Sequence, residues 1–276
     1  MTLIPRSHKI FYGVICAAAL LIAVLGYFFP PRLAAIATWL VLPPLHARFV
    51  GALYFYGAIF MVSCMTARYQ AEVRLAMGMI ATWTGLLFVV SILSLSAFDL
   101  SLLPPWIWFA SYSIYPLIAL YMAWTSRHEG REKLPGAPLP AWARMFLSVQ
   151  GVIVAGFALA LMILPNAMVA LWPWKITPLL AQTYGGPLLA LSVGSWSFAQ
   201  RHTWAGARPV IPAMFVFAAG VLIASFLHLS LFSFASPAAW VWFLTFATAT
   251  LFLGAMMVHV LPKVTPQPGE NSQKKG

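Results

Sequence analysis

The sequence predicts an all-α membrane protein with eight transmembrane helices, built as two parallel four-helix repeats with both termini in the cytoplasm. Three observations predict this fold: long apolar segments, an uneven distribution of basic residues over the loops, and internal similarity at a spacing of 134 residues. Hydrophobic residues make up 62% of the 276 residues, charged residues make up 8%, and the mean hydropathy is +0.88. A soluble domain carries about 25% charged residues. The composition therefore excludes a soluble enzyme, a nucleic-acid-binding domain and a disordered regulator.

The apolar segments are long enough to cross a membrane, because a membrane-crossing helix needs about 20 apolar residues. The first segment follows two basic residues, as a signal peptide would, but its apolar run exceeds the roughly 7–15 residues of a signal-peptide core. We therefore expect it to be a retained span. The connecting segments are too short to fold as separate domains. The predicted spans are residues 10–29, 49–67, 75–97, 106–125, 146–164, 179–199, 209–231 and 240–261.

The basic residues predict the orientation. Three of them, Arg32, Arg48 and Lys175, fall on one side of the predicted spans, and the other thirteen fall on the opposite side. Cytoplasmic loops of membrane proteins are enriched in Lys and Arg, so we expect both termini in the cytoplasm and a location in a cell membrane, the bacterial inner membrane. The net charge of +11 is mainly an orientation signal and predicts no nucleic-acid partner. The thirteen are Arg6, Lys9, Arg68, Arg74, Arg127, Arg131, Lys133, Arg144, Arg201, Arg208, Lys263, Lys274 and Lys275.

A shift of 134 residues aligns the two halves of the chain. Residues 93–109 and 227–243 are identical at seven of seventeen positions, including two Trp pairs. Each half has an even number of predicted spans, so both halves begin on the same side of the membrane. The repeat is then parallel, with its pseudo-two-fold axis along the membrane normal, and we expect a cavity between the halves. The expected division is a first half at 1–130, a cytoplasmic linker at 131–143, a second half at 144–262 and a disordered cytoplasmic tail at 263–276.

Both halves share an unusual outer segment, residues 30–48 and 164–178, bracketed by prolines and containing Trp. Proline interrupts helices, so we expect these segments to lie in the outer interface or to be partly re-entrant rather than to span. Two Trp residues then begin each of spans four and eight. They fit an aromatic belt at headgroup depth or a Trp-lined mouth for an apolar or cationic ligand. The four are Trp106, Trp108, Trp240 and Trp242.

The Trp-Pro-Trp…Thr-Pro-Leu run at 172–179 and the Trp-x-Trp-Phe sequences that begin spans four and eight carry a family resemblance. The chain resembles uncharacterised bacterial polytopic membrane proteins with duplicated four-helix halves. The resemblance covers most of the second half and less of the first. It implies an architecture and a membrane location, and it supplies no activity and no residue roles.

The predicted spans contain no Asp, Glu, Lys or Arg. Ion-coupled transporters usually carry such residues within the membrane, because these groups bind the coupling ion. Their absence argues against a proton pump, a sodium symporter and a carrier of charged solutes. There is also no HExxH, GxSxG or P-loop motif. Cys16 and Cys64 lie within spans and are expected to be packing residues.

The remaining polar residues predict a candidate site at the outer face. Arg48 and Asp99 lie at one membrane level and would form an ion pair, or Arg48 would extend to lipid phosphate. His228, near the outer end of span seven, would bond to a neighbouring helix, contact a cavity, or bind a metal or haem with His46 as the second axial ligand. We expect no other cofactor or metal and assign no catalytic residue. The candidate polar outer-face site is Arg48, Asp99, Gln182 and His228.

Three functions remain compatible with the sequence. The first is a membrane protein that binds or passes an apolar or lipid-like small molecule between its halves without ion coupling. The second is an accessory or scaffold subunit that packs against another membrane protein. The third is an enzyme that acts on a lipid-linked substrate at the outer face, where few residues offer chemistry.

Overall fold

The computed structural model describes residues 2–40, 43–128, 134, 136–200 and 203–260. In this part of the chain the regular secondary structure is helical, apart from two isolated β-bridges, and short turns and loops connect the helices. The cytoplasmic tail expected at 263–276 and most of the charged part of the linker lie outside the described residues. The helices of the first half are α1 (Arg6–Phe28), α2 (Pro30–Ile36), α3 (Pro44–Thr66), α4 (Gln70–Val73), α5 (Ala76–Leu93), η1 (Leu95–Ala97) and α6 (Leu103–Thr125). Those of the second half are α7 (Ala141–Ile163), α8 (Pro165–Leu171), α9 (Pro178–Ala199), α10 (Trp204–Ala207), α11 (Ile211–Leu227), η2 (Leu229–Leu231) and α12 (Pro237–Val260).

Within the described residues, six helices are long and apolar enough to cross a membrane, so the chain is a multi-pass membrane protein. They are Arg6–Phe28, Pro44–Thr66, Gln70–Leu93, Leu103–Thr125, Ala141–Ile163 and Pro237–Val260. The other two predicted spans correspond to α9, which is not among the six, and to α11, which is apolar but only 17 residues long. Most residues of α9 are buried and several are Gly, Ser or Thr, because this helix packs on protein over most of its surface.

The two halves contain the same elements in the same order. Helix lengths run 23, 7, 23, 4, 18, 3 and 23 residues in the first half. In the second half they run 23, 7, 22, 4, 17, 3 and 24 residues. The outer segments do not span, as expected from their prolines: each contains a seven-residue helix, α2 or α8, with Pro in its first turn. The predicted spans at 75–97 and 209–231 are too long, because α5 ends at Leu93 and α11 at Leu227, and the separate helices η1 and η2 follow.

Side-chain hydrogen bonds recur at the same spacing. The indole N–H of Trp108 donates to Ser91 Oγ at 2.8 Å, and that of Trp242 donates to Ser225 Oγ at 2.9 Å. The indole N–H of Trp106 donates to the carbonyl of Leu100, and that of Trp240 to the carbonyl of Phe234, both at 2.9 Å. Each residue of the second half lies 134 positions after its counterpart. The geometry around the first turns of α6 and α12 is therefore the same in both halves.

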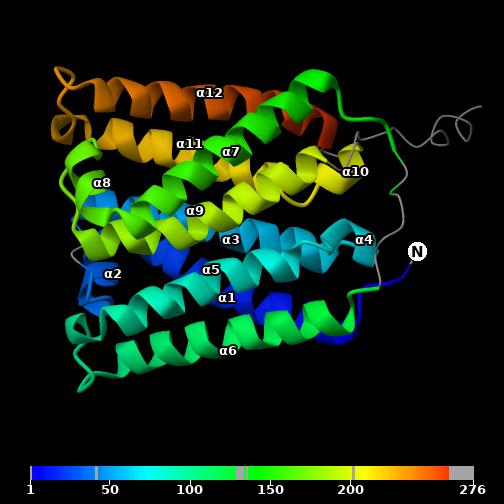
Figure 1. The fold of residues 1–276 in the computed structure, drawn as a ribbon, viewed down its shortest axis with the longest axis horizontal. Coiled ribbons are helices and arrows are strands. Elements are labelled where there is room, and N and C mark those ends of the chain that lie inside the picture. The colour runs from blue at the N-terminus through cyan, green and yellow to red at the C-terminus, as the bar shows by residue number, and fades with distance from the viewer. Residues whose placement is uncertain (1, 41–42, 129–133, 135, 201–202, 261–276) are drawn as a thin grey trace, which may run out of the picture.

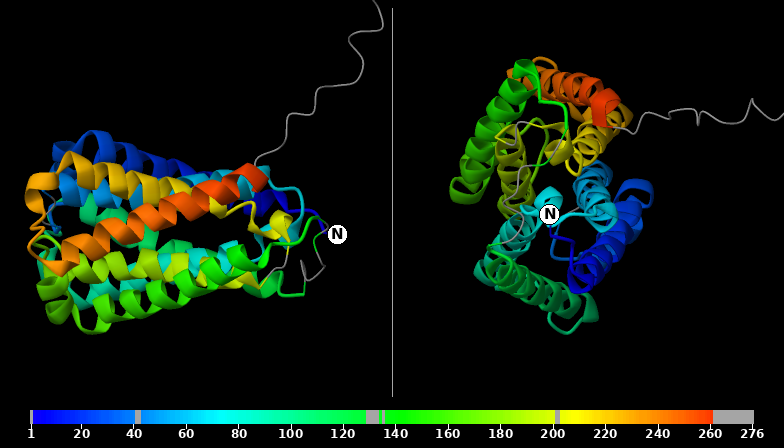
Figure 2. Two further views of the ribbon diagram at one scale, coloured as in Figure 1. Left: turned by 90° about the horizontal axis from the view of Figure 1, so that it is seen from above. Right: turned by 90° about the vertical axis from the view of Figure 1, so that its right-hand side faces the viewer.

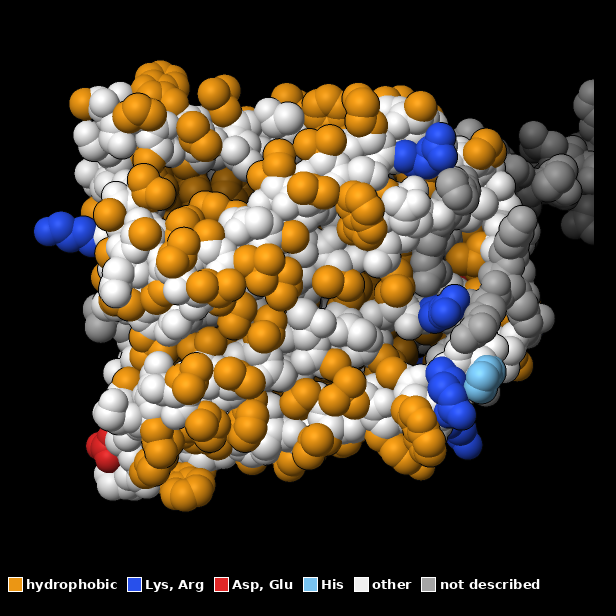
Figure 3. All heavy atoms as spheres, in the orientation of Figure 1, with side chains coloured by type: hydrophobic (Ala, Val, Ile, Leu, Met, Phe, Trp, Pro, Cys, Tyr) orange, Lys and Arg blue, Asp and Glu red, His pale blue; other side chains and the backbone are white. Residues whose placement is uncertain are grey.

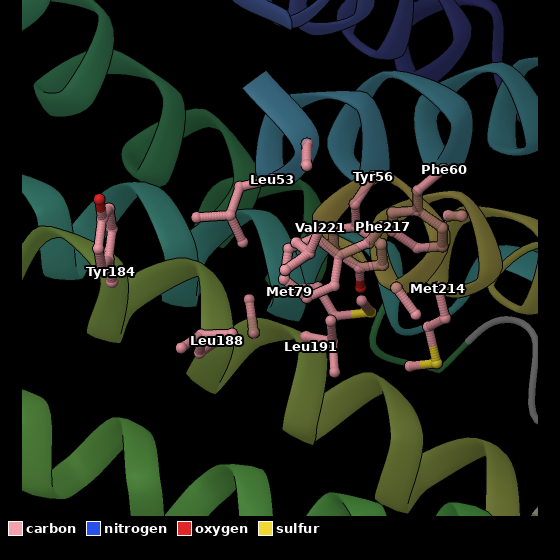
Figure 4. Close-up of a cluster of buried hydrophobic side chains, with 14 of the residues drawn as sticks. Leu53, Tyr56, Phe60, Met79, Tyr184, Leu188, Leu191, Met214, Phe217 and Val221 are labelled. Atoms are coloured by element: carbon pink, nitrogen blue, oxygen red, sulfur yellow. The ribbon is translucent and has the colours of Figure 1, made fainter. Parts of the chain in front are cut away.

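Four helices form the centre of the bundle. In the first half, α1 packs on α3 and α5 packs on α6. In the second half, α7 packs on α9 and α11 packs on α12. Across the halves, α3 packs on α11 and α5 packs on α9. In the end-on view of Figure 2, α12 and α6 lie at opposite edges of the bundle. Apolar side chains of α3, α5, α9 and α11 meet in the core, among them Tyr56, Met79, Leu191 and Phe217 (Figure 4).

The bundle has two chemically different ends. Helices α2 and α8 lie at one end, and α4, α10 and the N-terminus lie at the other, where α12 also finishes (Figure 1). We call these the α2/α8 end and the α4/α10 end. Lys and Arg side chains gather at the α4/α10 end of the face drawn in Figure 3, and hydrophobic side chains cover the length between the ends. Among the described residues, Arg6, Lys9, Arg68, Arg74, Arg127, Arg144 and Arg208 belong to elements of the α4/α10 end.

A glycine allows α3 to approach α1 closely. A Cβ atom built on Gly51 would lie 2.5 Å from the backbone nitrogen of Tyr27 and 3.0 Å from the carbonyl oxygen of Ala23. At the matching position of the second half, a Cβ on Gly185 would lie 2.4 Å from Cγ of Met162 and 3.1 Å from the carbonyl oxygen of Ala158. Backbone cannot move aside as a methionine side chain can, so Gly51 is the more demanding position.

We predict that Gly51→Ala lowers the free energy of unfolding by about 1–3 kcal/mol, because the added methyl group forces α1 and α3 apart. Gly78→Ala is the matched control, since a Cβ at Gly78 meets no atom within 4 Å. Thermal unfolding in detergent would measure both variants. Equal melting temperatures for the two variants would contradict close α1–α3 packing at Gly51.

Candidate ligand cavity

A cavity of about 340 Å³ lies inside the first half of the bundle. Its walls come from α1, α2, α3, α5 and α6, and the second half contributes one wall through Thr183, Tyr184, Pro187 and Ala190 of α9. The sequence led us to expect a cavity between the halves. This cavity lies largely within one half instead, because α9 reaches across to pack on α5 and closes the space between α3 and α5.

The cavity walls are apolar and aromatic, and among the described residues no Asp, Glu, Lys, Arg or His lines them. Several polar side chains of the wall are paired within the protein. The hydroxyls of Tyr54 and Tyr112 bond to each other. The hydroxyl of Thr84 donates to the carbonyl of Ile80 at 2.7 Å, and that of Thr183 donates to the carbonyl of Leu179 at 2.8 Å. Such bonds from Thr to the preceding turn satisfy a hydroxyl without a ligand.

Three other polar groups of the wall have no hydrogen-bond partner. They are the hydroxyls of Tyr56 and Tyr184 and the indole N–H of Trp39. Tyr56 is 1% exposed, Tyr184 is 0% exposed and Trp39 is 8% exposed. Buried polar groups are hydrogen-bonded in the great majority of proteins. The three unpartnered groups are not a feature of the cavity alone, because the buried hydroxyl of Tyr12 and the indole N–H groups of Trp172 and Trp174, which do not line the cavity, also have no partner.

The cavity opens where α1, α2 and α6 meet. Leu21 of α1 and Ile107 of α6 line the cavity and are 60% and 57% exposed, and Ile36 of α2 lines it and is 40% exposed. Nearer the α4/α10 end, the rings of Phe11 and Tyr115 bring α1 and α6 together, with centroids 6.1 Å apart. The apolar residues at the opening indicate that it faces lipid rather than water.

Aromatic side chains fill the matching space of the second half. The ring of Phe49 lies 4.6 Å from that of Tyr184, 6.1 Å from that of Trp172 and 5.7 Å from that of Trp242, centroid to centroid. Phe49 is the sixth residue of α3, and Thr183 is the sixth residue of α9. Matching positions of the two repeats thus carry different side chains. In α3 the position holds a large ring that fills space in the second half, and in α9 it holds a small side chain that leaves space in the first half.

The structure brings together two of the four residues predicted at the outer face. Nη1 of Arg48 on α3 is hydrogen-bonded to Nε2 of His228, directly after α11, which confirms the expected bond between His228 and a neighbouring helix. A guanidinium only donates, so Nε2 accepts and the neutral imidazole carries its proton on Nδ1. Gln182 lies apart and donates from Nε2 to the carbonyl of Met162 at 3.1 Å.

The ion pair between Arg48 and Asp99 does not form. Asp99 accepts hydrogen bonds from the hydroxyl of Ser101 at 2.6 Å and from its backbone N–H at 3.0 Å. These bonds lower the pKa of the Asp99 carboxyl. A carboxylate two residues before a serine satisfies itself locally, and Arg48 is half-buried against His228 rather than extended to lipid.

His46 and His228 have separate partners. Nε2 of His46 donates to the carbonyl of Lys175 at 2.6 Å, whereas Nε2 of His228 accepts from Arg48. Each imidazole thus already uses one ring nitrogen within the protein. In the described part of the chain, no group of three or more His, Cys, Asp or Glu side chains is placed to hold a metal ion.

The four predicted Trp residues divide into two pairs. Trp106 and Trp240 are 56% and 55% exposed at the outside of the bundle, where an aromatic belt would lie. Trp108 lines the cavity, and Trp242 is buried in the aromatic cluster around Phe49. The four therefore do not form one mouth, because residues two apart on a helix are rotated by about 200° and face nearly opposite sides.

Comparison with known proteins adds no function to these observations: no protein-family model, curated protein or solved structure matches the chain.

We predict that Arg48 and His228 are energetically coupled and that Arg48 and Asp99 are not. A double-mutant cycle of Arg48→Met with His228→Phe should give a coupling energy of about 0.5–3 kcal/mol, since the two side chains share a hydrogen bond. The same cycle with Asp99→Asn should give a value near zero. Thermal unfolding in detergent supplies the free energies, and the reverse order of the two coupling energies would contradict the described pairing.

Proposed function

We propose that the protein crosses the bacterial inner membrane eight times, as two parallel four-helix repeats with both termini in the cytoplasm. The identical order of elements in the two halves supports the repeat. The recurring Trp–Ser bonds support it independently. The gathering of basic residues at the α4/α10 end supports a cytoplasmic location for that end.

We predict opposite labelling of the two ends in intact cells. Cys16 and Cys64 are buried and can be replaced by Ala to give a cysteine-free background. In that background, Ser101→Cys at the α2/α8 end should react with a membrane-impermeant maleimide added outside. Ser7→Cys at the α4/α10 end should react only after permeabilisation. Labelling of Ser7→Cys in intact cells would contradict the proposed orientation.

We further propose that the first-half cavity binds or passes an apolar or lipid-like small molecule without ion coupling. The observation that carries this proposal is the cavity of about 340 Å³ with uncharged, largely apolar walls, open beside α1, α2 and α6. Ligand sites in proteins have volumes of roughly 300–1,000 Å³ and mostly apolar linings. A charged solute or coupling ion would lose its hydration in this cavity without gaining an opposite charge.

We predict that filling the cavity removes the ligand. Ser111→Phe adds a ring to the cavity wall on α6. It should abolish retention of a small molecule through purification in mild detergent, as measured by native mass spectrometry.

Ser113→Phe is the matched control, because Ser113 lies on the same helix and does not line the cavity. Retention of the same molecule by Ser111→Phe and the wild type would contradict a cavity site. A wild-type protein that carries no small molecule but co-purifies with a stoichiometric protein would favour the accessory-subunit function instead.

A further inference from the structure

The cavity is as long as one leaflet of a membrane is thick. Its lining follows α3 from Val50 to Met61, eleven residues along the helix, or about 16 Å. The hydrocarbon core of a membrane is about 30 Å thick, so the chains of one leaflet extend over about 15 Å. At the opening, Leu21 lies seven residues before α1 ends at Phe28. The opening is therefore about 10 Å from the α2/α8 end, within the hydrocarbon layer of that leaflet.

Aromatic side chains cover the cavity toward both ends of the bundle. Toward the α2/α8 end, the ring of Trp39 stacks on that of Phe98 at 5.0 Å and meets that of Trp108 edge to face at 5.2 Å, centroid to centroid. Toward the α4/α10 end, the rings of Phe11 and Tyr115 are in contact. Helix α1 packs mainly on α3, and α6 packs mainly on α5. In the described part of the chain, the way in that remains is sideways, between α1 and α6.

A sideways opening at this depth favours a hydrocarbon chain as the occupant. Leu21 and Ile107 are more than half exposed at the opening, and the layer that surrounds them contains lipid chains and no water. Apolar walls around empty space forfeit dispersion contacts. A lipid chain that enters restores these contacts and carries no polar group into the uncharged wall.

A cation lies one helical turn from the edge of the opening. Ile36 of α2 lines the opening, and Arg32 precedes it by four residues, so the two side chains share a face of α2. Arg32 is exposed and does not line the cavity, and its guanidinium lies over the ring of Phe29 at 5.3 Å. Among the described residues of α1, α2 and α6, the other Lys and Arg side chains are those of Arg6 and Lys9, at the opposite end. A guanidinium binds phosphate through charge-assisted hydrogen bonds.

We propose that the cavity holds one acyl chain of a phospholipid from the leaflet at the α2/α8 end. The chain enters between α1 and α6, past Leu21 and Ile107, and the phosphate stays outside the cavity at Arg32. This inference rests on the proposed function of the cavity and specifies the ligand, its leaflet and its route. The charged headgroup then needs no partner inside the apolar wall.

The test is photo-crosslinking of the full-length protein in phosphatidylcholine nanodiscs. The probe is phosphatidylglycerol with a diazirine at the end of one acyl chain, and diacylglycerol with the same chain is the probe without a phosphate. Mass spectrometry locates the adducts. They should fall on Leu53, Ile80 and Leu87, which line the cavity and are at most 5% exposed, so that lipid around the protein cannot reach them.

Two large side chains at the opening should block entry. The double variant Leu21→Trp with Ile107→Trp should lower the yield of cavity adducts from both probes at least about 5-fold, because the indoles occupy the space between α1 and α6. Leu20→Trp with Leu117→Trp is the matched control. Leu20 and Leu117 lie on the same two helices and are exposed, but they do not line the cavity, so the yield should stay at the wild-type level.

Removal of the cation should affect one probe only. Arg32→Gln should lower the yield from phosphatidylglycerol by roughly 2- to 5-fold, the effect of one cation on an anionic lipid. The yield from diacylglycerol should not change. An equal loss for both probes, or no loss for either, would overturn the assignment of the phosphate to Arg32.

The remaining outcomes separate failure of this inference from failure of the proposed function. Adducts confined to lipid-exposed residues, or an unchanged yield when Leu21 and Ile107 are both Trp, would overturn the acyl-chain inference while Ser111→Phe still abolished retention of a small molecule. Unchanged retention in Ser111→Phe would overturn the cavity site itself.

Discussion

Every polar group between the two ends of the bundle must find its partner inside the protein, because the hydrocarbon core of a membrane offers no water. The helices meet this requirement for their backbones, and the Thr and Ser hydroxyls meet it by bonding to the preceding turn. Charged residues meet it by lying at the ends. Among the described residues, the hydroxyls of Tyr12, Tyr56 and Tyr184 and the indoles of Trp39, Trp172 and Trp174 do not meet it within the chain, and they lie both in the cavity wall and away from it. The reason to regard the first-half cavity as a binding site is therefore its volume of about 340 Å³ and its uncharged, apolar wall.

The second constraint is that two similar halves must pack against each other. Helices α3, α5, α9 and α11 supply the contacts between the halves. The bond between Arg48 and His228 and the bond from His46 to the carbonyl of Lys175 join the halves at the α2/α8 end. Phe49 enters the second half and packs on Tyr184, whereas Thr183 faces the first-half cavity. The halves share one backbone plan but have different interiors, which leaves this cavity on one side of the pseudo-two-fold axis.

The sequence was sufficient to predict an all-helical membrane protein, and the prolines of the outer segments correctly predicted that α2 and α8 do not span. It placed the start and end of most long helices within a few residues. It overestimated the ends of α5 and α11, because apolar residues continue past Leu93 into η1 and past Leu227 into η2, and hydropathy cannot distinguish a helix from an apolar loop.

The polar site was harder to predict. Arg48 and Asp99 have opposite charges at one level, but Asp99 satisfies itself with Ser101, and the Asp-x-Ser spacing was the signal for that outcome. The cavity could not be predicted from residue types, since Tyr56 and Tyr184 look like ordinary packing residues within apolar helices. The available signal was the difference in size between Phe49 and Thr183, which occupy matching positions of the repeat. This difference predicts a cavity only once the packing position of α9 is known.

The most direct test of the central claim is a density map of the wild-type protein purified in native lipid nanodiscs. The account predicts elongated density in the first-half cavity, continuous with the opening between α1 and α6. An empty cavity, or one that contains only separate water-sized peaks while a lipid lies elsewhere between the halves, would contradict it.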